Sequence, residues 1–180
     1  MVMKLMVLIF VFGIIFSAAT GYRWKKNPVT FSVQNYTSTL SSNQIRDGVT
    51  QAFNIWSRVI PLDFKECCGS NADILLSFKP LDGTLVGWTN YKWNGDGAFY
   101  HADTYFNNRN SWGLKDPRKT DIIAVAVHEI GHALGLTGHS GDSNSVMNSW
   151  IKWTDGNGNY RYPQLSSSDI SNIQNLYGRR

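Results

Sequence analysis

Residues 128–139 read His128-Glu129-Ile130-Gly131-His132-Ala133-Leu134-Gly135-Leu136-Thr137-Gly138-His139. Two histidines four positions apart lie on one face of a helix, so His128 and His132 can bind the same metal ion. Glu129 is placed to deprotonate a water on that metal, and a glycine soon after the second histidine commonly ends a helix. His139 then follows on the returning chain. Three histidines and one open position are typical of a catalytic zinc site rather than a structural one.

The alternative to a metal site is an ordinary helix with histidines on its surface. The chain has only 4 histidines, and all but one lie within this segment. The run before them, residues 121–127, is apolar enough to bury the helix, which disfavours that alternative. We expect the helix to begin near Thr120, with Thr120 or Asp121 as its N-cap.

The same segment resembles the zinc-binding sequence of the metzincin endopeptidases, and within them of the matrixins, the matrix metalloproteinase family. The family has two residues between its glycine and its third histidine, whereas this chain has three, Leu136-Thr137-Gly138. At the family spacing Gly138 would stand at the ligand position, and it has no side chain to bind a metal. We therefore expect a one-residue bulge that brings in His139, with Gly138 supplying a positive φ.

A methionine after the third histidine is a second feature shared with that family. Metzincins have a methionine turn beneath the metal, and Ser145-Val146-Met147 resembles it. The resemblance implies that Met147 forms an apolar floor for the site rather than a ligand. Asn148 and Ser149 replace the Tyr-Pro usual in matrixins, so the family's substrate preference is not expected to carry over.

The rest of the chain predicts one α+β domain. Residues 81–96 are rich in Gly, Asp and Asn, which predicts mainly loops and turns. The other predicted elements are, in order, a strand over 29–33, a helix capped by Ser41 or Ser42, strands over 72–78, 97–102 and 104–106, the histidine helix, and a last helix from Ser166 to Tyr177 whose Ser166 and Asp169 resemble a capping box.

The resemblance to matrixins extends over nearly the whole chain, from Arg23-Trp24 to Tyr177-Gly178. It implies the metzincin-type fold, a twisted, mixed five-stranded sheet with three helices and a cleft that holds the zinc. It also implies that an extended substrate pairs with an edge strand around residues 99–102. The substrate-binding residues would be Phe99, Tyr100 and Ala102, with Phe99 at the rim of the main specificity pocket.

Other metal sites of the family are incomplete in this sequence. Matrixins hold a structural zinc with three histidines and an aspartate, and only His101 matches one of those histidines. We therefore expect one zinc ion, with His101 as a polar strand residue. The asparagine-rich residues 106–112 leave Ca²⁺ binding possible but weakly supported, because carboxylates are missing. Residues 155–159 are expected to form a tight hairpin turn.

The first residues have the layout of a secretory signal peptide. Lys4 precedes an apolar run over residues 5–16, and Ser17-Ala18-Ala19 follows. The run is shorter than the roughly 20 residues that cross a bilayer, so we favour cleavage near Ala19 over a membrane anchor. The expected organisation is a signal peptide over 1–19 and a matrixin-like catalytic domain over 20–180, with no recognisable prodomain or haemopexin-like domain.

Charge and cysteine usage set further bounds on the possible partners. The net charge of +4 is modest, and no basic-aromatic stripe, recognition helix or glycine-rich phosphate loop points to nucleic acid. Cys67 and Cys68 are adjacent and are the only cysteines. Free thiols, a strained bond between neighbours and an intermolecular bridge all stay open.

Together these features predict a secreted, extracellular, monomeric zinc endopeptidase without a membrane span. Glu129 would act as general base, and the substrates would be proteins or peptides, with extracellular matrix as one candidate. A separate protein inhibitor is one way to restrain such an enzyme. The alternative is a secreted, inactive binding protein on the same scaffold, with His139 misplaced by the extra residue. The retention of Glu129 argues against it, because a decoy needs no base.

Overall fold

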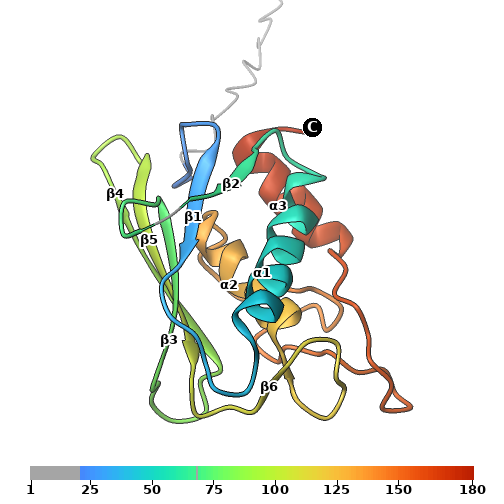
Figure 1. The fold of residues 1–180 in the computed structure, drawn as a ribbon. Coiled ribbons are helices and arrows are strands. Elements are labelled where there is room, and N and C mark those ends of the chain that lie inside the picture. Colours follow the sequence, from blue (N-terminus) through green and yellow to red (C-terminus); the bar gives the residue numbers. More distant parts are fainter. Residues whose placement is uncertain (1–20, 68) are drawn as a thin grey trace, which may run out of the picture.

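A mixed five-stranded sheet and three helices make up the described part of the chain, residues 21–67 and 69–180, in the computed structural model (Figure 1). The elements are β1 (Val29–Val33), α1 (Ser42–Ser57), β2 (Phe64–Glu66), β3 (Ile74–Lys79), β4 (Gly87–Trp93), β5 (Phe99–Asn107), β6 (Trp112–Gly113), β7 (Thr120–Asp121), α2 (Ile122–Ala133) and α3 (Ser167–Tyr177). The expected fold is confirmed. The predicted signal peptide and Cys68 lie outside the described residues. Among the described residues, no helix is long and apolar enough to cross a membrane.

The sheet has the order β2-β1-β3-β5-β4, with every neighbouring pair parallel except β4 and β5. The expectation that residues 81–96 are mainly loops is therefore wrong over β4. The turn-forming residues lie at its two ends, whereas its middle contains the strand-favouring residues Trp88, Thr89 and Tyr91. Composition averaged over the whole segment concealed this strand.

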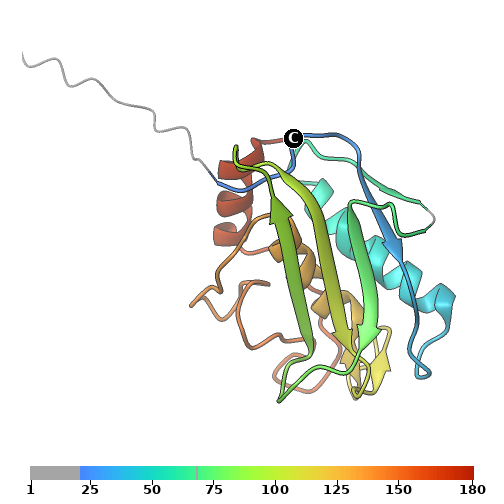
Figure 2. The same ribbon diagram turned by 90° about the vertical axis from the view of Figure 1, so that its left-hand side faces the viewer.

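The position of β5 corrects a second expectation, that residues 99–102 form an edge of the sheet. On one side of β5, Phe99 pairs with Trp93 and Ala102 with Tyr91 of β4. On the other side, the Phe99 amide donates to the Arg23 carbonyl at 2.9 Å, and Ala102 pairs with Ile74 of β3. The free edge on this side of the sheet belongs to β4 (Figure 2).

All three helices lie on one face of the sheet (Figures 1 and 2). Helix α1 begins at the predicted cap, where Ser41 and Gln44 form a capping box. Two buried indoles join the first part of the chain to α2. The Trp56 Nε1 group donates to the Val127 carbonyl and the Trp24 Nε1 group to the Ala133 carbonyl, each at 2.9 Å. These bonds tie α2 to α1 and to the segment before β1.

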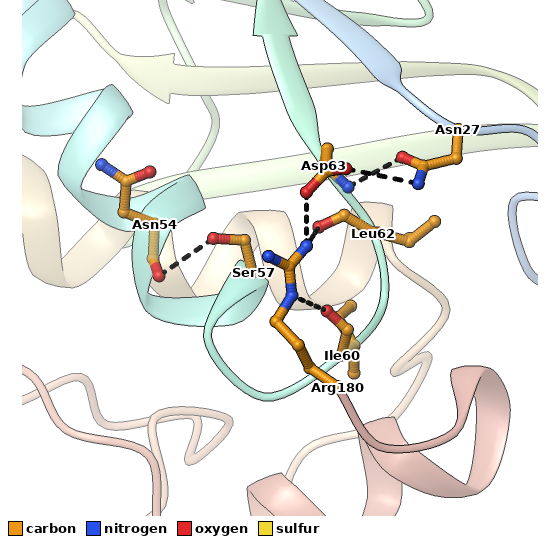
Figure 3. A network of polar contacts seen from close by, with 7 residues as sticks. All are labelled: Asn27, Asn54, Ser57, Ile60, Leu62, Asp63 and Arg180. Atoms are coloured by element: carbon orange, nitrogen blue, oxygen red, sulfur yellow. Dashed lines mark hydrogen bonds and ion pairs between the residues drawn. The ribbon is translucent and has the colours of Figure 1, made fainter.

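The last residue is tied to the loop after α1 (Figure 3). The Arg180 guanidinium donates to the carbonyls of Ile60 at 3.0 Å and Leu62 at 3.1 Å, and it pairs with the Asp63 carboxylate. The side-chain oxygen Oδ1 of Asn27 accepts from the Asp63 backbone amide at 2.8 Å. Helix α3 also starts at its predicted cap, where Ser166 and Asp169 form the capping box. Asn27 and Arg180, which lie far apart in the sequence, therefore contact the same loop.

Candidate metal centre

Helix α2 carries two of the predicted ligands and begins at a predicted cap. The Asp121 carboxylate accepts from the Ala124 amide at 2.9 Å, which satisfies a free N–H group in the first turn. The apolar residues 122–127 are buried, as the sequence predicted. His128 is 3% exposed, whereas His132 is partly exposed. The helix therefore presents both imidazoles from a rigid, buried element.

Gly135 turns the chain back toward the centre. It has a φ of +105°, and a Cβ at this position would lie 2.3 Å from the Tyr22 carbonyl oxygen. Its own amide donates to the His132 carbonyl, and the Leu136 amide donates to the Gly131 carbonyl, each at 3.0 Å. Both the conformation and the close backbone contact exclude a side chain here.

We expect Gly135→Ala to lower the free energy of unfolding by at least about 2 kcal/mol, because it adds backbone strain and a clash with main-chain atoms. Gly138→Ala is the matched control. A Cβ at Gly138 meets nothing within 4 Å, so its effect should stay within about 0.5 kcal/mol. Urea unfolding of the two variants beside the parent chain measures both values. Equal stabilities for the two variants would contradict the prediction.

The three predicted histidines lie together. Their nitrogen donor atoms all lie within 4.8 Å of one another, and this is the only such cluster of three or more His, Cys, Asp or Glu side chains among the described residues. His128 Nε2 and His132 Nε2 are 3.1 Å apart. The expectation that Gly138 has a positive φ is wrong. The returning chain is instead fixed by the Ser140 amide, which donates to the Met147 carbonyl at 2.8 Å.

Hydrogen bonds set which imidazole nitrogen of each helical histidine faces the centre. His128 Nδ1 donates to the Val146 carbonyl at 2.7 Å, and His132 Nδ1 donates to the Leu136 carbonyl at 2.6 Å. A carbonyl only accepts, so each Nε2 keeps its lone pair. Burial and the neighbouring His132 lower the pKa of His128 to about 4, and burial lowers the pKa of His132.

These residues fit a zinc ion. Neutral histidines with their second nitrogen bonded to a carbonyl are the usual zinc ligands. Tetrahedral bonds of about 2.0–2.1 Å place ligand nitrogens roughly 3.3 Å apart, close to the 3.1 Å between His128 and His132. His139 completes the set from an exposed loop, with its ring centroid 5.1 Å from each of the other two.

Met147, the residue expected to form the floor of the site, packs against the helix that carries His128 and His132. It is 3% exposed, and a Cβ on Gly131 of α2 would lie 2.3 Å from its sulfur. Asp169 holds this turn in place, and sequence reasoning assigned Asp169 only to the cap of α3. Its carboxylate accepts from the Ser145 hydroxyl at 2.5 Å and the Val146 amide at 3.0 Å. Asp169 thus supports the Val146 carbonyl that orients His128.

Glu129 is 3% exposed and faces β4. The Thr89 hydroxyl donates to its Oε2 at 2.8 Å. A Cβ at Gly87 would lie 2.5 Å from Oε1, so the absence of a side chain at Gly87 leaves room for the carboxylate. Burial raises the pKa of Glu129 to about 7, against the opposing effect of the Thr89 bond. A carboxylate with that pKa is suited to general base catalysis near neutral pH.

The histidines and Glu129 open into a cleft of about 760 Å³ between β4 and residues 149–153. Among the described residues, Glu129 is the only acidic side chain that lines it, and no Lys or Arg does. The cleft walls are largely aromatic, with Trp88, Tyr91 and Trp93 on the β4 side and Trp150 and Trp153 on the other. The lining is therefore rich in aromatic side chains and contains few charged ones.

The residues predicted to bind substrate do not line this cleft. Phe99 and Ala102 are 4% and 0% exposed because β5 is an inner strand. Phe99 packs against Trp24 at a centroid distance of 5.7 Å, so it does not form a pocket rim. Tyr100 is 53% exposed elsewhere on the surface. The residues beside the centre are those of β4, which the sequence reasoning had placed in loops.

His101 and the asparagine-rich segment have other contacts. His101 Nε2 lies 3.1 Å from the Asp103 carboxylate on the same strand. The Asn107 side-chain amide donates to the Leu85 carbonyl at 2.8 Å, and Arg109 donates to the Leu81 carbonyl at 3.1 Å. Both contacts hold the loop that leads into β4. The predicted hairpin turn at residues 155–159 is confirmed by a hydrogen bond from the Asp155 amide to the Asn159 carbonyl at 2.9 Å.

Comparison with known proteins gives a consistent result. A family model described as matrixin matches residues 23–178. The chain is 38% identical over 178 residues to "Matrix metalloproteinase-C" of Caenorhabditis elegans, covering 90% of this chain and 30% of that protein. It is 33% identical over 166 residues to "Stromelysin-2" of Rattus norvegicus, covering 88% and 33% respectively. The chain thus spans about a third of the length of the curated relatives it matches.

Proposed function

Because this chain belongs to the matrixin family, we propose that it is a secreted zinc-dependent endopeptidase in which Glu129 is the general base. One observation supports this most directly: three convergent histidines lie beside a buried carboxylate, in a cleft along a free sheet edge. Secretion is supported by the composition of residues 1–19. We propose that the chain acts as a monomer on protein or peptide substrates.

His128, His132 and His139 would hold the zinc. When bound there, zinc supplies Lewis acidity toward water and toward a peptide carbonyl. Glu129 contributes the proton transfer. Its carboxylate takes a proton from the attacking water and later gives it to the amine that leaves. The Thr89 hydroxyl donates to one carboxylate oxygen, which leaves the other oxygen, next to Gly87, to exchange the proton.

We propose that the substrate backbone pairs with β4 rather than with residues 99–102. Strand β4 pairs with β5 on one side only and lines the cleft. Main-chain pairing to a free edge fixes the direction of an extended peptide while tolerating many side chains. Selectivity then depends on the cleft walls, which include Trp93 on one side and Trp150 on the other.

A secreted, inactive binding protein on the same scaffold is the competing function. The buried Glu129 disfavours it. Burying a carboxylate with one hydroxyl partner costs stability, and a pure binding protein gains nothing from that cost. One feature would favour the binding protein: His139 lies on an exposed loop, which is the least constrained part of the metal centre.

We predict that the purified full chain hydrolyses a quenched fluorescent peptide, contains about one zinc per molecule, and loses activity when a chelator removes the metal. Added zinc should restore hydrolysis. Metal analysis and fluorescence on the same sample measure both properties. Bound zinc without cleavage of peptides or casein would favour the binding protein. Folded protein with no affinity for zinc would refute the endopeptidase and would also favour the binding protein, in which the extra residue misplaces His139.

A further inference from the structure

The cleft wall opposite β4 is formed by a long irregular segment, residues 149–164, here called the wall segment. It runs between the Met147 turn and the cap of α3 (Figure 1). Ser149, Trp150, Ile151 and Trp153 of this segment line the cleft. Trp150 is 81% exposed, so the body of the protein does not hold it in place. What positions this segment therefore sets the width of the cleft.

Few polar contacts fix the wall segment. Its own hydrogen bonds close the hairpin, such as the Arg161 amide to the Trp153 carbonyl at 2.9 Å. Among the described residues, a single hydrogen bond joins residues 149–164 to elements outside the Met147 turn, from the Tyr160 hydroxyl to the Asp121 carboxylate at 3.3 Å. The apolar anchors include Ile151 and Tyr162, which pack against the core, and Pro163, which is buried.

A small pocket of about 30 Å³ separates part of the wall segment from α2. It is open to the surface and lies between Ala124 of α2 and wall residues that include Trp150 and Ile151. At this pocket the wall segment has no direct packing against the helix, so the polar contact of Tyr160 is the link to α2 that a substitution can test.

The acceptor of the Tyr160 hydrogen bond is Asp121, the N-cap of α2, the helix that carries His128 and His132. Asp121 is 0% exposed, and its two oxygens accept from the Ala124 amide at 2.9 Å and the Lys115 amide at 2.8 Å. These two hydrogen bonds hold the Asp121 carboxylate in place independently of Tyr160. Burial and the nearby Asp121 charge raise the pKa of Tyr160 far above neutral. The hydroxyl therefore stays a donor throughout the physiological range.

We propose that Tyr160 is a positioning residue that, through its hydroxyl bond to Asp121, sets the place of the cleft wall relative to the catalytic helix and so the fit of substrate. The expected effect of Tyr160 on catalysis rests on the proposed function, whereas its expected effect on the position of the wall segment does not. Tyr160 does not line the cleft, so it acts on substrate only through residues 149–153.

Tyr160→Phe tests this proposal, with Tyr162→Phe as the matched control. The control removes a hydroxyl two positions away that makes no hydrogen bond to a described residue. We expect Tyr160→Phe to speed hydrogen–deuterium exchange across residues 149–164 and to raise KM for a quenched fluorescent peptide about two- to ten-fold, the range that loss of one hydrogen bond gives. The values of kcat, zinc content and Tm should stay close to those of the parent chain.

Unchanged exchange and unchanged KM in Tyr160→Phe would overturn the proposal, because apolar contacts alone would then place the wall. A fall in kcat at unchanged KM would also overturn it, because the bond would then serve the catalytic helix. Equal effects from Tyr162→Phe would refute the specific role of Tyr160. If the parent chain cleaves no peptide, the proposed function fails, while the exchange rates still decide whether Tyr160 holds the wall segment.

Discussion

Glu129→Gln is expected to lower kcat/KM for peptide hydrolysis by a factor of about 10²–10⁴, the contribution of a positioned general base. The substitution keeps the shape of the side chain and an oxygen that accepts from the Thr89 hydroxyl, now at 2.8 Å from Oε2. It removes the ability to take and return a proton. The zinc content should not change, because the three histidines do not depend on the carboxylate. Steady-state kinetics and metal analysis on the same preparation measure both outcomes.

Glu66→Gln is the matched control, because Glu66 and Glu129 are the only glutamates in the chain. Glu66 is exposed on β2 and pairs with Arg46 at 3.0 Å. An exposed ion pair contributes little, so this variant should retain the activity of the parent. Full activity in Glu129→Gln would remove Glu129 from the mechanism. Loss of zinc in that variant would mean that the carboxylate supports the metal centre rather than the proton transfer.

Local signals in the sequence predicted several elements accurately. The caps of α1 and α3 depend on residues three positions apart, Ser41 with Gln44 and Ser166 with Asp169. Helix α2 and its pair of histidines depend on a four-residue spacing. Such signals are short-range, so the sequence alone contains them. The resemblance to matrixins added the five-stranded sheet and the Met147 turn, which no local pattern specifies.

Contacts between distant residues were not predictable in the same way. Thr89 meets Glu129 across 40 positions, and Tyr160 meets Asp121 across 39 positions. Each contact depends on how strands and loops pair in space. The strand β4 was missed for a related reason, since flanking Gly, Asp and Asn residues outweighed its short alternating centre. Gly87 was an available signal, because a glycine inside a strand often marks a close approach by another group.

The metal centre itself depends most on His139, where this chain departs from the family spacing. We expect His139→Ala to weaken zinc binding by more than the roughly 10–100-fold that loss of an outer-shell partner causes, because it removes a direct ligand. Hydrolysis at stoichiometric zinc should fall to the background rate. Competition with a zinc-binding dye measures the affinity, and His101→Ala is the matched control.

His101 is the one histidine outside the cluster, and its Nε2 lies 3.1 Å from the Asp103 carboxylate. His101→Ala should therefore bind zinc as tightly as the parent.

A hydrogen bond explains why His139 is expected to bind zinc despite the extra residue. The Ser140 amide donates to the Met147 carbonyl, which fixes the returning chain directly after His139. If His139→Ala kept full zinc affinity, two histidines would hold the ion, and the added residue would have moved the third ligand out of the site. Weak binding in the parent and His139→Ala alike would lead to the same conclusion, since a zinc ion with two protein ligands lacks the three that catalytic sites use.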